Sequence, residues 1–141
     1  MPLLEVKNLE VSFGLRSGEV KALRNINFTL DRGERLGLVG ESGAGKSVLG
    51  FSILNLIAKP GRISGGEILF EGKNLADLSP EELRNVRGNR ISMIFQDPMM
   101  TLNPVLTIGQ QMIECLQAHR TISKDNARTI AIQKLQQVQI P

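Results

Sequence analysis

Apolar and polar residues alternate along two stretches near the start of the chain. The first covers residues 4–13, and the second contains Ile26, Phe28 and Leu30. Successive side chains of a strand point to opposite faces of a sheet, so this alternation predicts two strands that each bury one face. We expect both strands to lie near a sheet edge or in a small antiparallel sheet.

Two other stretches are short and almost continuously apolar. They cover residues 35–39, which end at Gly40, and residues 91–95, which end at Gln96. A strand that is covered on both faces has this pattern, because neither face meets water. We therefore predict two central strands. Open α/β sheets bind ligands at the carboxyl ends of such strands, which is where Gln96 would lie.

Residues 46–58 carry apolar side chains at helical spacing and predict a helix with a broad buried face. Lys-Pro-Gly at residues 59–61 would close this helix. After a turn at residues 64–66, residues 67–70 predict a short strand. Residues 35–58 are therefore predicted to form a strand, a glycine-rich loop and a helix, in that order.

Helix-capping patterns mark the starts of the remaining helices. Residues 79–82, Ser-Pro-Glu-Glu, have the pattern of a capping box with proline at the first helical position, and they predict a helix over residues 80–87. Residues 107–110, Thr-Ile-Gly-Gln, repeat the pattern at the start of another helix. A last helix is predicted to begin near Ser123.

Composition indicates one globular domain or part of one. The chain has 141 residues, of which 41% are hydrophobic and 22% are charged, so it can bury one core. Its longest mostly apolar stretch, residues 48–58, is too short to span a bilayer. The N-terminus carries acidic residues where a secretory signal needs a basic end and an apolar run, so we expect the chain to stay in the cytosol.

The net charge of +3 invites a nucleic-acid interpretation, but the distribution of charge argues against one. The 17 Lys and Arg residues are scattered singly, and the chain has no Trp or Tyr to stack on bases. We therefore expect no nucleic-acid partner. The single cysteine, Cys115, has no disulfide or metal-binding partner of its own type, and we expect it to be a small buried residue.

Residues 40–47, GESGAGKS, match the phosphate-loop pattern G-x-x-x-x-G-K-[ST] between a predicted buried strand and a predicted helix. The glycines allow backbone N–H groups to point at phosphate oxygens, and the helix dipole adds to the attraction. Lys46 would place its charge near the β and γ phosphates, and the Ser47 hydroxyl could bind Mg²⁺. The alternative is a purely structural one, in which these residues form a glycine-rich turn with an incidental lysine. The predicted binding residues are Gly40, Glu41, Ser42, Gly43, Ala44, Gly45, Lys46, Ser47 and Val48.

Longer stretches around these residues resemble the nucleotide-binding subunit of ABC transporters. LDRGERLGLVGESGAGKS, at residues 30–47, resembles the approach to the Walker A loop of that family. RISMIFQDPMMTLNP, at residues 90–104, resembles its Q-loop and is most similar to importers for oligopeptides, dipeptides and nickel. The resemblance extends over essentially all 141 residues.

The resemblance implies an α/β fold with the P-loop NTPase core of ABC type. Residues 1–97 would form an N-terminal antiparallel β portion and the core up to the Q-loop. Residues 98–141 would begin the helical subdomain. The whole chain would thus be the N-terminal part of one ATP-binding domain, with ATP and Mg²⁺ as its ligands.

The resemblance also implies roles for two residues outside the phosphate loop. Gln96 would contact Mg²⁺ and the attacking water, so that Lys46 and Gln96 are the expected catalytic residues and Ser47 and Gln96 the expected metal ligands. Phe13 would stack on adenine, where the family more commonly has Tyr. Without the resemblance, Gln96 is simply a polar residue at a strand end, and Phe13 a core residue at a strand end.

Two further residues are not assigned to the site. Asp97 follows an apolar run, as a Walker B aspartate does, but Gln96 intervenes and the resemblance places this stretch in the Q-loop. His119 does not match the family's switch histidine, which follows the Walker B segment. We expect His119 to lie at a partly exposed helix end.

Several family segments have no counterpart among these residues: the signature LSGGQ, the Walker B aspartate and the following glutamate, the D-loop and the switch histidine. We therefore expect the 141-residue chain to bind nucleotide weakly and to hydrolyse little or none. Strands that the family contributes later in the sequence would also be missing, so an unpaired strand edge would make the isolated chain poorly soluble.

For the intact subunit, the resemblance implies an ATPase that drives import of peptides or related small solutes. Its partners would be a second ABC ATPase subunit and transmembrane permease subunits, with an extracytoplasmic solute-binding protein acting indirectly. It would lie peripherally on the cytoplasmic face of the inner membrane. The alternative is a truncated, catalytically inactive nucleotide-binding or interaction module. A DNA-repair or chromosome protein is disfavoured by the importer-like Q-loop.

Overall fold

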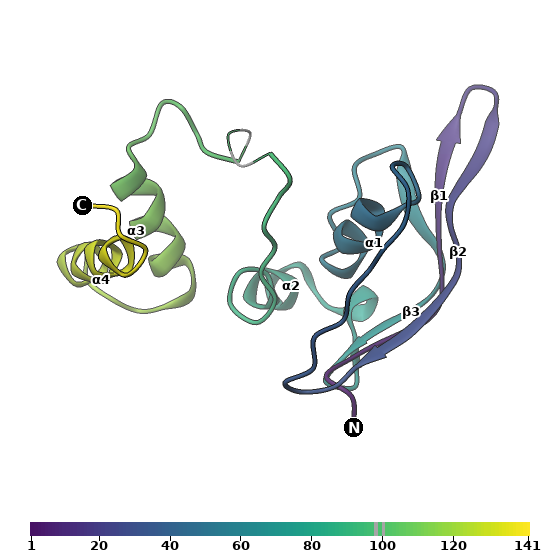
Figure 1. The fold of residues 1–141 in the computed structure, drawn as a ribbon, viewed down its shortest axis with the longest axis horizontal. Coiled ribbons are helices and arrows are strands. Elements are labelled where there is room, and N and C mark those ends of the chain that lie inside the picture. The colour runs from purple at the N-terminus through teal and green to yellow at the C-terminus, as the bar shows by residue number, and fades with distance from the viewer. Residues whose placement is uncertain (98, 100) are drawn as a thin grey trace. The chain divides into compact units, whose positions relative to one another are not determined.

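The computed structural model describes residues 1–97, 99 and 101–141 (Figure 1). The chain divides into two compact units, Met1–Ile91 and Ser92–Pro141. Pro98 and Met100 belong to the stretch that resembles the Q-loop, and they lie outside the described residues.

The first unit is built on a four-stranded antiparallel sheet with the order β2-β1-β3-β4. The strands are β1 (Leu4–Leu15), β2 (Gly18–Leu30), β3 (Gly61–Phe70) and β4 (Lys73–Asn74). The two alternating stretches lie in β1 and β2, which pair antiparallel with Leu4 opposite Leu30 and Leu15 opposite Gly18. Strand β2 begins eight residues before Ile26, where the alternation begins. The strand predicted over residues 67–70 is confirmed and begins earlier, because residues 61–65 also pair with β1. The turn predicted at residues 64–66 is therefore wrong, since these residues lie within β3.

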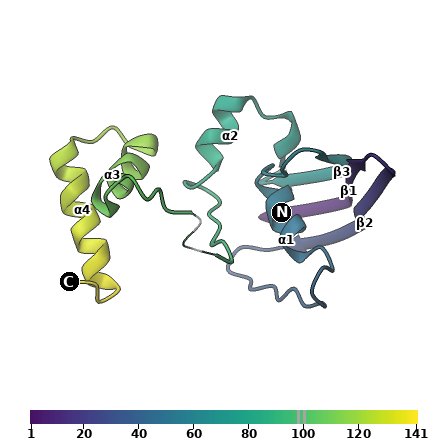
Figure 2. The same ribbon diagram turned by 90° about the horizontal axis from the view of Figure 1, so that it is seen from above.

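The core of this unit lies between the sheet and helix α1 (Lys46–Ile53) (Figure 2). Leu49 of α1 packs there with buried residues of the sheet and of the short 3₁₀ helix η1 (Leu75–Asp77). Burial of these side chains is the main favourable term that joins helix and sheet. The buried residues of this cluster are Leu4, Val6, Leu9, Val11, Leu23, Leu49, Ile68 and Leu75.

A bulge in β1 interrupts the alternation at Asn8, which has φ 48°. The pairing shifts between Val6 and Leu9 on the β2 side and between Lys7 and Glu10 on the β3 side. The Asn8 N–H donates to Oδ1 of Asn27 in β2, 2.8 Å away. The extra residue explains why the buried apolar positions change from even numbers, Leu4 and Val6, to odd numbers, Leu9 and Val11.

Helix α1 ends at Ile53, and the predicted extension to residue 58 is wrong. Asn55 adopts φ 50°, a left-handed conformation that asparagine tolerates better than most residues and that ends a helix. Leu54 nevertheless stays buried, so the apolar pattern continues after the helix has stopped. The apolar pattern predicted the burial of Leu54 correctly, but Leu56 is exposed and lies outside the helix.

The two predicted central strands are also corrected. Residues 34–40 form no strand, and of residues 91–95 only Ile91 makes an isolated parallel bridge, to Arg87. Val39 is 95% exposed and Ile94 is 96% exposed. A central strand needs a hydrogen-bonded neighbour on each side, and the part of the chain that the structure describes supplies none to these segments.

The remaining helix of the first unit is α2 (Pro80–Val86), which starts as predicted. The Ser79 hydroxyl accepts from the Glu82 N–H, and the Glu82 carboxylate accepts from the Ser79 N–H at 2.8 Å. This is the reciprocal capping box that the sequence predicts.

The second unit contains α3 (Ile108–His119) and α4 (Lys124–Gln137), which pack on each other through Ile113, Ala127 and Ala131. Thr107 and Gln110 form the predicted capping box, and Ser123 caps α4. Cys115 is exposed, which corrects the expectation that it is buried, because Ile113 rather than Cys115 faces α4. Among the described residues, none of the helices has the length and hydrophobicity that crossing a bilayer requires.

Candidate phosphate-binding site

Residues 40–47 form a loop that winds directly into α1. Gly43 and Gly45 have φ values of 82° and 88°, in the region that favours glycine. The Ala44 N–H donates to the Glu41 carbonyl at 3.1 Å and closes a tight turn within the loop. Gly45 is the N-cap of α1, and as a glycine it has no side chain with which to cap the helix.

The first turn of α1 therefore has backbone N–H groups with no hydrogen-bond acceptor in the helix, at the end where the loop enters it. The first hydrogen bond of the helix runs from the Leu49 N–H to the Gly45 carbonyl, at 2.9 Å. The N–H groups of Lys46, Ser47 and Val48 precede this bond and have no acceptor within the helix. Together with the positive end of the helix dipole, they form the donor set that suits a phosphate group.

Strand β2 fixes the position of the loop through Gly45. A Cβ atom on Gly45 would lie 2.7 Å from Cδ2 of Leu23 and 3.2 Å from the carbonyl oxygen of Ala22. Leu23 is buried in the core, so its side chain has little room to move. Glycine is thus required here both by its φ value and by the close approach of β2.

The Lys46 ammonium lies across the loop. Its Nζ atom donates to the carbonyl oxygens of Gly40 and Glu41, each at 2.6 Å. An ammonium carries three protons, so these two bonds leave a third for another acceptor. A Cβ on Gly40 would lie 3.9 Å from Nζ and 3.3 Å from Cβ of Ala44, which shows how closely the loop surrounds this charge.

The phosphate loop also contains a side chain of the kind that binds Mg²⁺. The Ser47 side chain, at the first turn of α1, is exposed and offers one hydroxyl oxygen. Within the described part of the chain, no group of three or more His, Cys, Asp or Glu residues is placed to hold a metal. The donor set therefore fits Mg²⁺ bound mainly through phosphate oxygens and water, as is usual for this ion, and not a metal held by protein alone.

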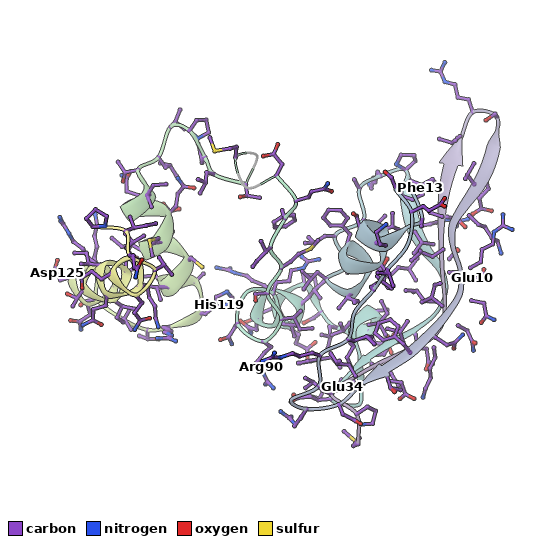
Figure 3. All side chains as sticks on the ribbon, in the orientation of Figure 1. Glu10, Phe13, Glu34, Arg90, His119 and Asp125 are labelled. Atoms are coloured by element: carbon purple, nitrogen blue, oxygen red, sulfur yellow. The ribbon has the colours of Figure 1, made fainter. Side chains whose placement is uncertain are left out.

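Phe13 lies in β1 opposite Val20 and Gly61 and is half-buried (Figure 3). Its ring covers Gly61, because a Cβ on that glycine would lie 2.6 Å from Cε1 of the ring. The ring also packs against the core cluster. These contacts are those of a core residue at a strand end, while stacking of Phe13 on adenine stays a prediction.

Gln96 belongs to the second unit, and its side chain is exposed. The residues before it do not form the predicted strand, so its role also stays a prediction. The neighbouring Asp97 carboxylate accepts from the Met99 N–H at 3.1 Å in a local turn. His119 is the last residue of α3 and is half-buried, as we expected.

Sequence patterns did not single out Glu71, although its carboxylate joins residues that are far apart in the chain. It forms ion pairs with Arg32 and Arg90. The hydrogen bond from Arg32 is the main reason that the pKa of Glu71 is held below its ordinary value of 4.5. The only local signal is that Glu71 and Gly72 form the tight turn between β3 and β4.

Comparison of the sequence with a family pattern and with individual proteins indicates the same family. The sequence pattern of the family described as ABC transporter matches residues 23–141. The oligopeptide transport ATP-binding protein OppD of Bacillus subtilis is 54% identical over 140 residues, 99% of this chain and 39% of that protein. The dipeptide transport ATP-binding protein DppD of Lactococcus lactis is 51% identical over 140 residues, 99% of this chain and 40% of that protein. The chain thus spans about two fifths of the length of these relatives.

Comparison with solved structures agrees. The fold is similar to the dimeric bacterial ABC transporter cassette MJ0796, with a TM-score of 0.80 and 27% identity over 94% of this chain and 56% of that one. The same cassette in a post-hydrolysis state, bound to ADP and Pi, gives a TM-score of 0.81 and 26% identity. These matches confirm the predicted α/β fold of the ABC cassette type.

Proposed function

Because the chain belongs to the ABC transporter family, we propose that it forms the nucleotide-binding part of an ATP-binding subunit of an importer. The observation that carries the proposal is the loop at residues 40–47. There, the Lys46 ammonium and the free N–H groups at the start of α1 are presented together. This arrangement supplies positive charge and hydrogen-bond donors to the phosphates of ATP.

Each residue would act on a different part of the nucleotide. The backbone from Gly40 to Val48 would hold the phosphates, and Lys46 would offset the charge of the β and γ groups. Mg²⁺, when bound, would neutralise further phosphate charge, with the Ser47 hydroxyl as a ligand and Gln96 as a contact. Phe13 would stack on the adenine ring.

We further propose that the longer subunit couples ATP binding and hydrolysis to uptake of peptides or related small solutes. The support is the identity with relatives named as oligopeptide and dipeptide transport ATP-binding proteins. The proposed partners are a second ATP-binding subunit and transmembrane permease subunits, and indirectly an extracytoplasmic solute-binding protein. The proposed location is the cytoplasmic face of the cell membrane.

The proposal is tested by titrating the chain with a fluorescent ATP analogue in the presence of Mg²⁺. The wild type and Lys73→Ala, which removes an exposed lysine of β4, should both bind and release the analogue to excess ATP. Lys46→Ala should lose the binding. Equal affinities for Lys46→Ala and the wild type would refute a phosphate-binding role for the loop.

A further inference from the structure

Glu71 occupies a strained position at the hairpin turn between β3 and β4. Its φ is 51° and that of Gly72 is 80°, so both central residues of this two-residue turn are left-handed. The Glu71 N–H donates to the Leu3 carbonyl at 2.9 Å, which ties the turn to the start of β1. The backbone that carries the carboxylate is therefore fixed to the sheet.

The carboxylate binds one arginine with each of its oxygens. Arg32 donates from Nη2 to Oε1, and Arg90 donates from Nη2 to Oε2 at 2.7 Å. The Arg90 guanidinium also lies over the ring of Phe70, with 5.6 Å between Cζ and the ring centre. Glu71 thus bridges two arginines that are 58 positions apart in the sequence.

Each arginine precedes a segment that leads to part of the proposed site. Arg32 follows β2 and comes before residues 34–40, which run into the phosphate loop. Arg90 follows α2 and comes before residues 91–95, which run to Gln96. Each segment is thus joined at its start, through one arginine, to the same carboxylate on the sheet.

We propose that Glu71 is a positioning residue for nucleotide binding, which fixes the starts of both segments by bridging Arg32 and Arg90. This inference rests on the proposed function. Exposed ion pairs contribute little to the overall stability of a fold. We therefore expect Glu71 to affect the placement and mobility of the two segments rather than the melting temperature.

The bridge makes a selective prediction for hydrogen exchange, measured on peptides covering residues 33–47 and 91–97. Glu71→Gln, which keeps the size of the side chain and removes its charge, should raise exchange in both peptides. Arg32→Gln should raise exchange only in the first, and Arg90→Gln only in the second. Simple destabilisation of the fold would raise exchange in both peptides for every variant, in step with unfolding.

The matched control is Glu10→Gln. Glu10 binds Lys21 at 2.8 Å and its side chain is 33% exposed, against 27% for Glu71. It lies on the face of the sheet that points away from α1 (Figure 3). Glu10→Gln should leave the exchange of both peptides and the affinity for the ATP analogue unchanged, whereas Glu71→Gln should raise Kd about two- to five-fold.

Circular dichroism should show that the variants are folded, and Glu71→Asp replaces Glu71→Gln if the latter is not. Because aspartate is shorter, it should keep one arginine contact and loosen one segment. Unchanged exchange in both segments, or loosened segments with unchanged affinity, would overturn the inference. If the folded wild type bound no nucleotide, the proposed function would fail and with it the role in binding, while the exchange pattern would still show whether Glu71 is an anchor.

Discussion

The guanidinium of Arg87, just after α2, binds the backbone carbonyl of Leu54 at the end of α1. Its Nε atom donates to the Leu54 oxygen at 2.8 Å, and its Nη2 atom donates to the Asn55 oxygen at 2.7 Å. The last carbonyls of a helix have no intrahelical partner and carry partial negative charge. One side chain thus stabilises the end of α1 opposite to the phosphate loop.

Arg87→Ala should destabilise the first unit, because it removes two charge-assisted hydrogen bonds and leaves their carbonyls with water or without a partner. We expect a loss of about 1–3 kcal/mol in the free energy of unfolding, measured by urea denaturation. Arg84→Ala is the control, because Arg84 is an exposed residue of α2. Equal urea midpoints for Arg87→Ala and Arg84→Ala would show that the hydrogen bonds of Arg87 do not stabilise the first unit.

Gly66→Ala should be far more damaging than Gly65→Ala. A Cβ on Gly66 would lie 2.4 Å from the carbonyl oxygens of both Lys7 and Asn8, at the bulge, and Gly66 has φ 83°. A Cβ on Gly65 would meet only the Glu10 side chain, at 3.7 Å. We expect Gly66→Ala to cost about 3 kcal/mol or more, or to prevent folding, because backbone atoms at a bulge cannot move aside.

Comparing soluble yield and thermal melting of the two variants measures this difference. Similar melting temperatures for Gly66→Ala and Gly65→Ala would show that the bulge does not need the close approach of β3.

Gly45→Ala should destabilise the chain more than Gly43→Ala does. Both glycines have positive φ, so both substitutions carry a backbone strain of about 1 kcal/mol. Only the Cβ on Gly45 would collide with β2, since nothing lies within 4 Å of a Cβ on Gly43. Thermal melting should place Gly45→Ala below Gly43→Ala, and the reverse order would contradict the fixed position of the loop.

The capping box of α2 should make stability depend on pH through Glu82. The hydrogen bond from the Ser79 N–H is the main cause that lowers the pKa of Glu82 from its ordinary value of 4.5. Since the pKa is lower in the folded than in the unfolded chain, the stabilisation is present above about pH 4.5 and is lost as the pH falls through the folded-state value.

Glu82→Gln should therefore show a shallower fall in melting temperature than the wild type between about pH 7 and about pH 3. Glu81→Gln, which changes a carboxylate of the same turn outside the capping box, should keep the wild-type slope. Identical slopes for all three proteins would exclude a contribution of Glu82 to acid sensitivity.

Features that depend on a few neighbouring residues could be predicted from the sequence. The capping boxes at Ser79 and Thr107 each need only four residues, and the phosphate-loop pattern needs eight. Alternation predicted β1 and β2 because each strand buries one face whatever its partners are. Local chemistry is sufficient in these cases.

Features that depend on distant partners could not be predicted. Continuous apolar runs indicate that a segment is covered on both faces, but Val39 and Ile94 are exposed because no element among the described residues packs over these side chains. Glu71 meets Arg32 and Arg90 only after the sheet has formed, and no spacing in the sequence relates these three residues. The end of α1 was missed because apolar periodicity continues past Asn55.

The bulge at Asn8 also determines where Phe13 lies. Without the extra residue, Leu4 and Val6 would share their face of the sheet with residues 8, 10 and 12, and Phe13 would point the other way. The insertion places the ring with Leu9 and Val11, on the side where Ile57 approaches Gly61. The side of the sheet that Phe13 occupies is thus decided five residues earlier, and a deletion at Asn8 would move the ring without altering Phe13 itself.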